Sequence, residues 1–197
     1  TSALQLNAQS DHNIAIGYAA LYNTSANTTG ANVAIGYQAG FYNVTGQNNT
    51  YLGYNSGMGA SGESPSGNVF IGSGAGAVHG TGGDNVAIGY LAMKDTDHGD
   101  CPTSVDNVFV GKSAGGGTWA TNDSNSNVGI GNYSLDAAMN GALRNSALGM
   151  YSLSGIIGGQ DNVGVGYGTG GSISDGIQNT AIGSGALNSL TTGNYND

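Results

Sequence analysis

The sequence is poor in charge, and above all in positive charge. Lysine and arginine together number 3 among 197 residues, against 12 aspartates and glutamates, which gives a net charge of −9. Nucleic-acid binding depends on many Lys and Arg side chains that neutralise phosphates. Lys94, Lys112 and Arg144 are too few and too scattered to form such a patch. We therefore expect no nucleic-acid partner.

Long apolar runs and cysteine pairs are also missing. No stretch approaches the roughly 18 apolar residues of a membrane span, so we expect no membrane insertion. Cys101 is the single cysteine and excludes an intrachain disulfide framework. What remains is 38 glycines and short Val/Ile segments separated by Asn, Ser, Thr and Gly. This alternation indicates regularly punctuated β-structure.

One short pattern recurs throughout the chain. The hexapeptide NVAIGY occurs at 32–37 and again at 85–90, and both are copies of the pattern Asn-x-x-aliphatic-Gly. The spacings between successive copies run from 17 to 22 residues, with 17 as the base period. After each glycine come two variable residues, a small residue, and then Leu, Gly or Met. The ten copies begin at Asn13, Asn32, Asn49, Asn68, Asn85, Asn107, Asn127, Asn145, Asn162 and Asn179.

A unit of this length predicts one coil of a parallel β-solenoid, with two strands of about four to five residues and two turns. We expect ten to eleven such coils. The segments TSAL at 1–4 and TTGNYND at 191–197 match partial units, so we expect 1–197 to be a single repeat domain within a longer fibre. We number positions within a unit from the asparagine. That residue is predicted to sit in turn geometry and to bond between coils through its amide. The glycine at position 5 suits a positive φ or a tight backbone contact.

Positions 3 and 4 of the unit lie on opposite sides of the predicted strand, and both are apolar. Position 4 is always aliphatic and is predicted to fill the interior: Ile16, Ile35, Leu52, Ile71, Ile88, Val110, Ile130, Leu148, Val165 and Ile182. Position 3 mixes small and aromatic residues: Ala15, Ala34, Tyr51, Phe70, Ala87, Phe109, Gly129, Ala147, Gly164 and Ala181. A strand that is apolar on both sides needs a partner on its second face, which predicts a homo-oligomer.

Units such as NVAIGYQAG (32–40) and NTAIGSGAL (179–187) resemble the head repeats of trimeric autotransporter adhesins, the YadA-like heads. They are also similar to NTAIGYxAL repeats of bacteriophage tail fibres. The resemblance covers essentially the whole chain. It implies a left-handed β-roll, a homotrimer around a common axis, and an extracellular location on a virion appendage or a cell surface.

Insertions fall at one place in the unit, before the next asparagine, so they should project from one edge. Residues 94–106 and 116–126 are the longest of them. Such loops often carry binding function in repeat proteins. Trp119 in the second loop is either an exposed contact platform or a cover for a coil edge. His98, in the first loop, is a further candidate for surface contact.

Two other groups of residues are candidates for ligand contact. Asp95, Asp97 and Asp100 offer oxygen ligands suited to calcium, although a solvated acidic loop explains them equally. Tyrosines recur at position 6, and those of three consecutive units are expected to stack, forming either a sugar-binding strip or a packing ladder. These three are Tyr18, Tyr37 and Tyr54.

The sequence shows no catalytic or cofactor-binding motif, and we predict a non-enzymatic protein without a cofactor. The leading hypothesis is a structural and adhesive fibre segment, as in a phage tail fibre, that binds a host-surface glycan or protein receptor. A bacterial extracellular filament or adhesin head is the alternative. An ice-binding solenoid is a distant alternative that calls for a ranked threonine array. Thr50 and Thr180 instead share position 2 with valines such as Val33.

Overall fold

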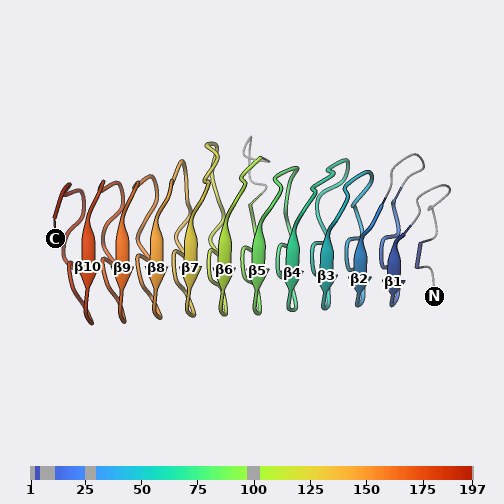
Figure 1. Cartoon of the computed structure of the whole chain (residues 1–197), viewed down its shortest axis with the longest axis horizontal. Helices are drawn as coiled ribbons and strands as arrows, with labels where there is room; N and C mark the ends of the chain where they lie inside the picture. Colours follow the sequence, from blue (N-terminus) through green and yellow to red (C-terminus); the bar gives the residue numbers. More distant parts are fainter. Residues whose placement is uncertain (1–2, 5–11, 25–29, 97–102, 197) are drawn as a thin grey trace.

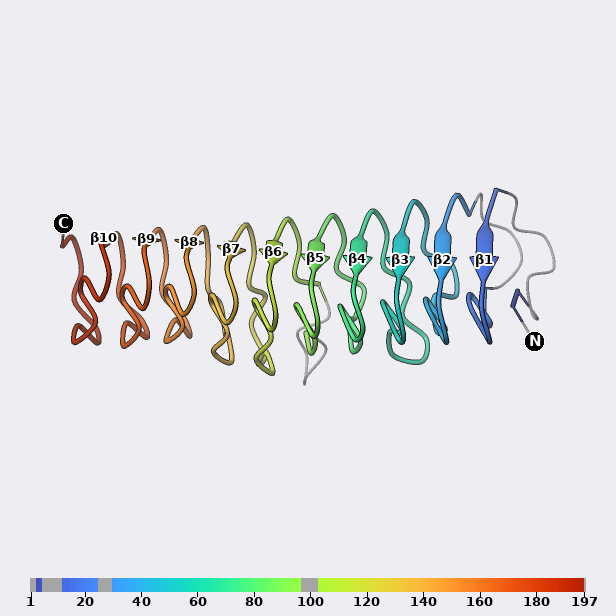
Figure 2. The same cartoon turned by 90° about the horizontal axis from the view of Figure 1, so that it is seen from below.

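The chain forms a β-solenoid in this computed structural model, which describes residues 3–4, 12–24, 30–96 and 103–196. Ten strands stack in sequence order into one parallel sheet along the long axis (Figures 1 and 2). The prediction of a parallel β-solenoid is confirmed. The strands are β1 (Ile14–Ile16), β2 (Val33–Ile35), β3 (Thr50–Leu52), β4 (Val69–Ile71), β5 (Val86–Ile88), β6 (Val108–Val110), β7 (Val128–Ile130), β8 (Ser146–Leu148), β9 (Val163–Val165) and β10 (Thr180–Ile182).

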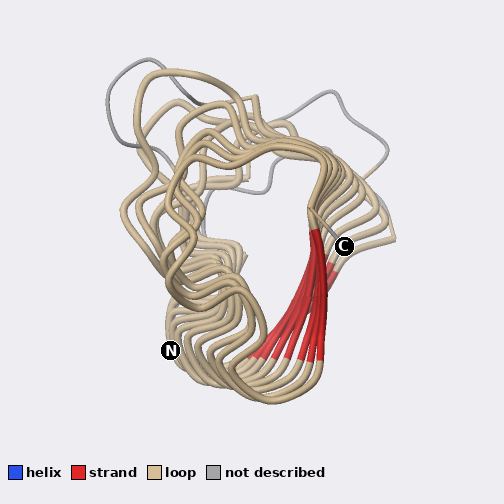
Figure 3. Ribbon diagram, turned by 90° about the vertical axis from the view of Figure 1, so that its left-hand side faces the viewer, coloured by secondary structure: helices blue, strands red, loops and turns tan. Residues whose placement is uncertain are grey.

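Each described coil contains one strand of three residues, where two longer strands were predicted. The second half of the unit runs as consecutive turns, because residues at positions 7 and 9 adopt positive φ. Gln38 and Gly40 show this in the coil of β2, with φ of 52° and 61°. Viewed along the axis, the strands superpose on one side and turns and loops complete each coil (Figure 3). Isolated bridges, such as Leu143 to Gln160 and Gln160 to Ile177, link neighbouring coils on the loop side.

The strands are in register, so every unit places the same position in the same column. Ala34 of β2 pairs with Tyr51 of β3, and Tyr51 pairs with Phe70 of β4. Glycine at position 5 follows each strand with φ between 110° and 142°. A Cβ on Gly36 would lie 2.2 Å from the carbonyl oxygen of Gly53. Glycine is therefore required here both by the positive φ and by the close approach of the next coil.

The interior lies on the side of position 3, and the sequence assignment of the two strand faces was wrong. Ala34, Tyr51, Phe70 and Phe109 are fully buried, whereas position 4 residues are half-buried or exposed. Ile182 at position 4, for example, is 70% exposed. The aliphatic column therefore faces outward, and the column of variable size fills the coil.

The variable size at position 3 is compensated at position 9, across the interior of the same coil. Where position 3 is aromatic, position 9 is glycine, and a Cβ on that glycine would come within 2.2 to 2.8 Å of the ring. Where position 3 is small, position 9 is usually Leu or Met. The compensated pairs are Ala15/Leu21, Tyr51/Gly57, Phe70/Gly76, Ala87/Met93, Phe109/Gly115, Gly129/Leu135, Ala147/Leu153 and Ala181/Leu187. This exchange of volume keeps the interior filled at constant coil width.

Candidate interaction surface

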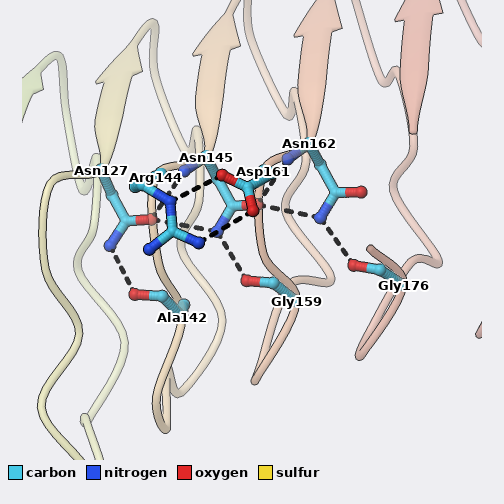
Figure 4. Close-up of polar contacts among 8 residues, drawn as sticks. All are labelled: Asn127, Ala142, Arg144, Asn145, Gly159, Asp161, Asn162 and Gly176. Atoms are coloured by element: carbon cyan, nitrogen blue, oxygen red, sulfur yellow. Dashed lines mark hydrogen bonds and ion pairs between the residues drawn. The ribbon is translucent and has the colours of Figure 1, made fainter. Parts of the chain in front are cut away.

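A ladder of asparagine side chains binds the coils to one another. The backbone N–H and the side-chain Nδ2 of Asn145 both donate to Oδ1 of Asn127, at 3.1 and 3.0 Å. Nδ2 of Asn145 also donates to the carbonyl of Gly159 at 2.7 Å, within its own coil. The same pattern repeats at Asn162 (Figure 4). Because the side-chain oxygen and Nδ2 of these asparagines both have hydrogen-bond partners, the side chains can be buried at little net cost in free energy.

The inter-coil role predicted for the asparagines is confirmed, but their predicted turn geometry is wrong. Positive φ belongs to the residue before each ladder asparagine, as at Ala31 with 47° and Arg144 with 56°. The ladder also continues to Asn196, whose N–H and Nδ2 both donate to Oδ1 of Asn179. At the other end, Leu4 packs against the core and its N–H bonds to the carbonyl of Ala20. The residues at both ends thus follow the repeat.

An outer face forms on the solvent side of the sheet, from the side chains at positions 2, 4 and 6. Position 2 contributes Ile, Val, Thr or Ser, and position 4 contributes Ile, Leu or Val in all ten strands. The best exposed of them include Ile14, Ile16, Leu148 and Ile182, between 52% and 70%. An exposed apolar area of this extent marks an interaction site on a soluble protein.

Charge is nearly absent from this outer face. Positions 2, 4 and 6 contain no Asp or Glu in any of the ten units, and Lys112 is their single charged residue. The Lys112 ammonium lies 5.3 Å from the ring centroid of Tyr133, and the Tyr133 hydroxyl raises the pKa of Lys112. The acidic residues in the described parts of the chain therefore occupy other positions of the coil.

The tyrosines at position 6 border the outer face and stack as predicted. The ring centroids of Tyr18 and Tyr37 are 5.1 Å apart, and those of Tyr37 and Tyr54 are 5.2 Å apart, with interplanar angles of 14° and 11°. These rings cover one another's faces and present their edges to solvent. A second stack, of Tyr133 and Tyr151, lies at position 7 in the coils of β7 and β8.

Trp119 is fully buried, so it is not an exposed contact platform. Its indole N–H donates to the carbonyl of Gly115 at 3.1 Å, and its ring meets Phe109 edge to face at 5.9 Å. The loop that begins at residue 116 turns this side chain into the interior, where burial of its large apolar area stabilises the fold most. Sequence alone did not decide between the two readings, because loop residues have no period that assigns them a side.

The loops along one edge of the solenoid are uneven (Figure 1), and of the remaining candidates Asp95 lies within the described residues. Asp95 accepts a hydrogen bond from the Thr118 hydroxyl at 3.0 Å. Asp97, His98 and Asp100 lie outside the described residues, so the calcium and surface-contact predictions there stay predictions. Within the described parts of the chain, no three His, Cys, Asp or Glu side chains come together as a metal site, and no enclosed pocket forms.

Away from the outer face, the surroundings of His79, Asp136 and Asp161 shift their pKa values. Burial lowers the pKa of His79 to about 4. The hydrogen bond between its ring and the Gly82 carbonyl raises this pKa and offsets part of the effect of burial. Partial burial raises the pKa of Asp136 to about 6. The Arg144 guanidinium forms two bonds to Asp161, at 2.7 and 2.8 Å, and holds the pKa of that carboxyl below its usual range (Figure 4). None of these groups lies on the outer face.

No helix in the described residues has the length and apolar character of a membrane span. No protein-family model, curated protein or solved structure is similar enough to this chain to count as a match.

Proposed function

We propose that this chain is a stiff segment of an extracellular fibre, in which three copies pack through their outer faces around a common axis. The observation that carries the proposal is the uncharged apolar outer face, which runs over all ten strands. A phage tail fibre or a similar surface appendage fits this arrangement best. A bacterial extracellular filament or adhesin head remains the alternative with the same architecture.

The dimensions of the outer face support a second copy as its occupant. Ten strands at about 4.8 Å spacing give a length of about 43 Å, and five residues at about 3.3 Å give a width of about 16 Å. The product, about 700 Å², is close to the roughly 800 Å² that each partner buries in a stable protein interface. In a threefold arrangement each copy contacts two neighbours through heterologous interfaces, which close into a ring.

The distribution of charge also favours a second copy of the chain as the occupant of the outer face. Copies that each carry a net charge of −9 repel one another, and this repulsion is weakest when the charged groups point away from the contact. The outer face meets this condition because its columns contain no acidic residue. An anionic membrane surface is disfavoured, since Lys112 is the single cation there.

The fibre would act mechanically, and its loops would make the specific contacts. Continuous backbone hydrogen bonds and the asparagine ladder resist bending and separation of coils along the axis. The uneven loop edge, which includes residues 58–67 and 116–126, would face outward, where a host or surface receptor can reach it.

Light scattering on the native particle tests the proposal. We expect a mass of about three times 19.4 kDa. Ile71→Lys places a charge in the middle of the outer face and is expected to reduce the mass to that of one chain. Ser61→Lys, on an exposed turn of the loop edge, adds the same charge elsewhere and should leave the mass unchanged. A monomeric wild-type chain would contradict the proposal.

A further inference from the structure

The tyrosine column at position 6 is interrupted once in the first five units. Tyr18, Tyr37 and Tyr54 occupy it in three consecutive coils, Ser73 follows, and Tyr90 resumes it. The backbone keeps its register across the interruption, because Gly74 N–H bonds to the carbonyl of Tyr54 and Leu91 N–H bonds to that of Ser73. The column therefore lacks a ring at this place without any shift of the coils.

The interruption has the thickness of one ring. Filled positions in this column carry one ring per coil, at centroid spacings of 5.1 and 5.2 Å. Two strand spacings amount to about 10 Å, so a ring placed between Tyr54 and Tyr90 would meet each of them at the spacing seen in the filled column. Tyr54, Ser73 and Tyr90 are all exposed.

Among the described rings, none stacks on Tyr54 from the side of Ser73. Tyr37 is covered on one side by Tyr18 and on the other by Tyr54. Tyr54 stacks on Tyr37 alone, which leaves its second face toward Ser73. Since a sugar ring binds to an aromatic face and not to an edge, the interruption offers a place in the column for such stacking.

The surroundings of the gap select the chemistry of the ligand. Tyrosine and serine hydroxyls, which donate and accept hydrogen bonds, line the gap. The aliphatic side chains of Leu52, Ile71 and Ile88 stand two residues before the three column members. No acidic residue occupies these columns, and the net charge of −9 repels anions. A neutral ring with apolar faces and a polar edge meets all of these conditions.

We propose that the gap at Ser73, between Tyr54 and Tyr90, is a binding site for one pyranose ring of a neutral saccharide. The ring replaces the missing member of the column, with its two faces on the tyrosines and its hydroxyls at the polar rim. The site is built within one chain, and it requires that the copies pack through positions 2 and 4 and leave the column at position 6 open to solvent.

Isothermal titration with neutral oligosaccharides tests the site on the native particle, with cellotetraose, chitotetraose and maltotetraose as probes. We expect at least one of them to bind. Ser73→Tyr fills the gap with a ring and should weaken that binding at least about tenfold, equivalent to about 1.4 kcal/mol. Ser73→Ala keeps the gap open and should bind within about threefold of wild type. Tyr90→Ala removes one wall and should weaken binding as Ser73→Tyr does.

Three results would overturn the site. The first is the absence of binding to all three probes and to a wider array of neutral glycans. The second is unchanged binding by Ser73→Tyr. The third is a change of particle mass in Ser73→Tyr, which would make the gap a contact between copies. The mass of the wild-type particle, measured separately, distinguishes the two proposals: a monomer that binds the probes would overturn the fibre and keep the site, whereas a trimer that binds none of them would keep the fibre and overturn the site.

Discussion

The two ends of the solenoid fill the same interior position with opposite chemistry. Eleven or twelve residues after the ladder asparagine, eight of the ten coils bury a side chain in the interior. In the N-terminal half the buried members are polar: Thr24, Asn43, His79 and Thr96. In the C-terminal half they are apolar: Trp119, Met139, Ile156 and Ile173.

Hydrogen bonds make the polar version possible. The Thr24 hydroxyl donates to the Asn43 carbonyl at 3.1 Å, and the His79 ring bonds to Thr96 Oγ1 at 2.7 Å and to the Gly82 carbonyl at 2.8 Å. The coil therefore does not require an apolar residue at this position. It requires a buried residue whose polar atoms all have partners. The two halves are therefore expected to differ in how their stability responds to pH, since the polar interior includes a group that titrates, His79.

The asparagine ladder is common to both halves, and its loss should cost them equally. Asn49→Ala and Asn127→Ala each leave at least two buried backbone or amide groups without partners, at about 1–3 kcal/mol per group. We expect each to lower the free energy of unfolding by about 4 kcal/mol in urea titrations. Arg144→Ala, which removes an exposed ion pair beside the ladder, should hardly move the midpoint. A large difference between the two asparagine variants would show that the ladder does not contribute equally to the stability of the two halves.

This ladder and the glycine column were predictable from the sequence because each depends on one residue type at one position. The two faces of the strand were not. Position 3 varies from Gly129 to Tyr51, and such variation is typical of a surface column. It is compatible with an interior because position 9 varies in the opposite sense, a long-range pairing that only the closure of the coil reveals. The outward-facing column of the strand was consequently assigned to position 3 instead of position 4, whereas the stacked tyrosines at position 6 were predicted correctly.

Acidification should act on the two halves with opposite sign. His79 has a pKa of about 6.5 when unfolded and about 4 when folded, so its neutral form contributes stability above pH 6.5. That stability, about 3 kcal/mol, is lost as the pH falls from about 6.5 to about 4. Asp136, whose pKa is raised to about 6 by burial, favours the folded state more as the pH falls.

Hydrogen exchange at pH 7 and pH 4.5, corrected for intrinsic rates, checks this opposition. Protection should fall in the coils of β4 and β5 and be kept or gained in the coil of β7. His79→Asn is the matched control. Asn43 occupies the equivalent place and donates to the Gly46 carbonyl three residues on, as His79 bonds to Gly82. This variant should remove the pH dependence around β4, and its persistence would show that another group titrates there.

The smallest effect concerns Tyr51, whose hydroxyl is fully buried without a hydrogen-bond partner among the described groups. Tyr51→Phe removes this unpaired hydroxyl and keeps the ring, so we expect the protein to gain about 1 kcal/mol. Phe70→Tyr makes the reverse change in the next coil and should destabilise it. Thermal midpoints measure both, and a loss of stability in Tyr51→Phe would mean that the hydroxyl is paired in solution.

The pairing of positions 3 and 9 constrains how such a chain can change in length over evolution. A crossover that exchanges whole units keeps each aromatic residue with its glycine, so the number of coils can grow or shrink without disturbing the interior. A crossover between these positions would join an aromatic residue to a leucine and leave a clash. The coil is thus the natural unit of recombination, and fibre length can evolve independently of fibre packing.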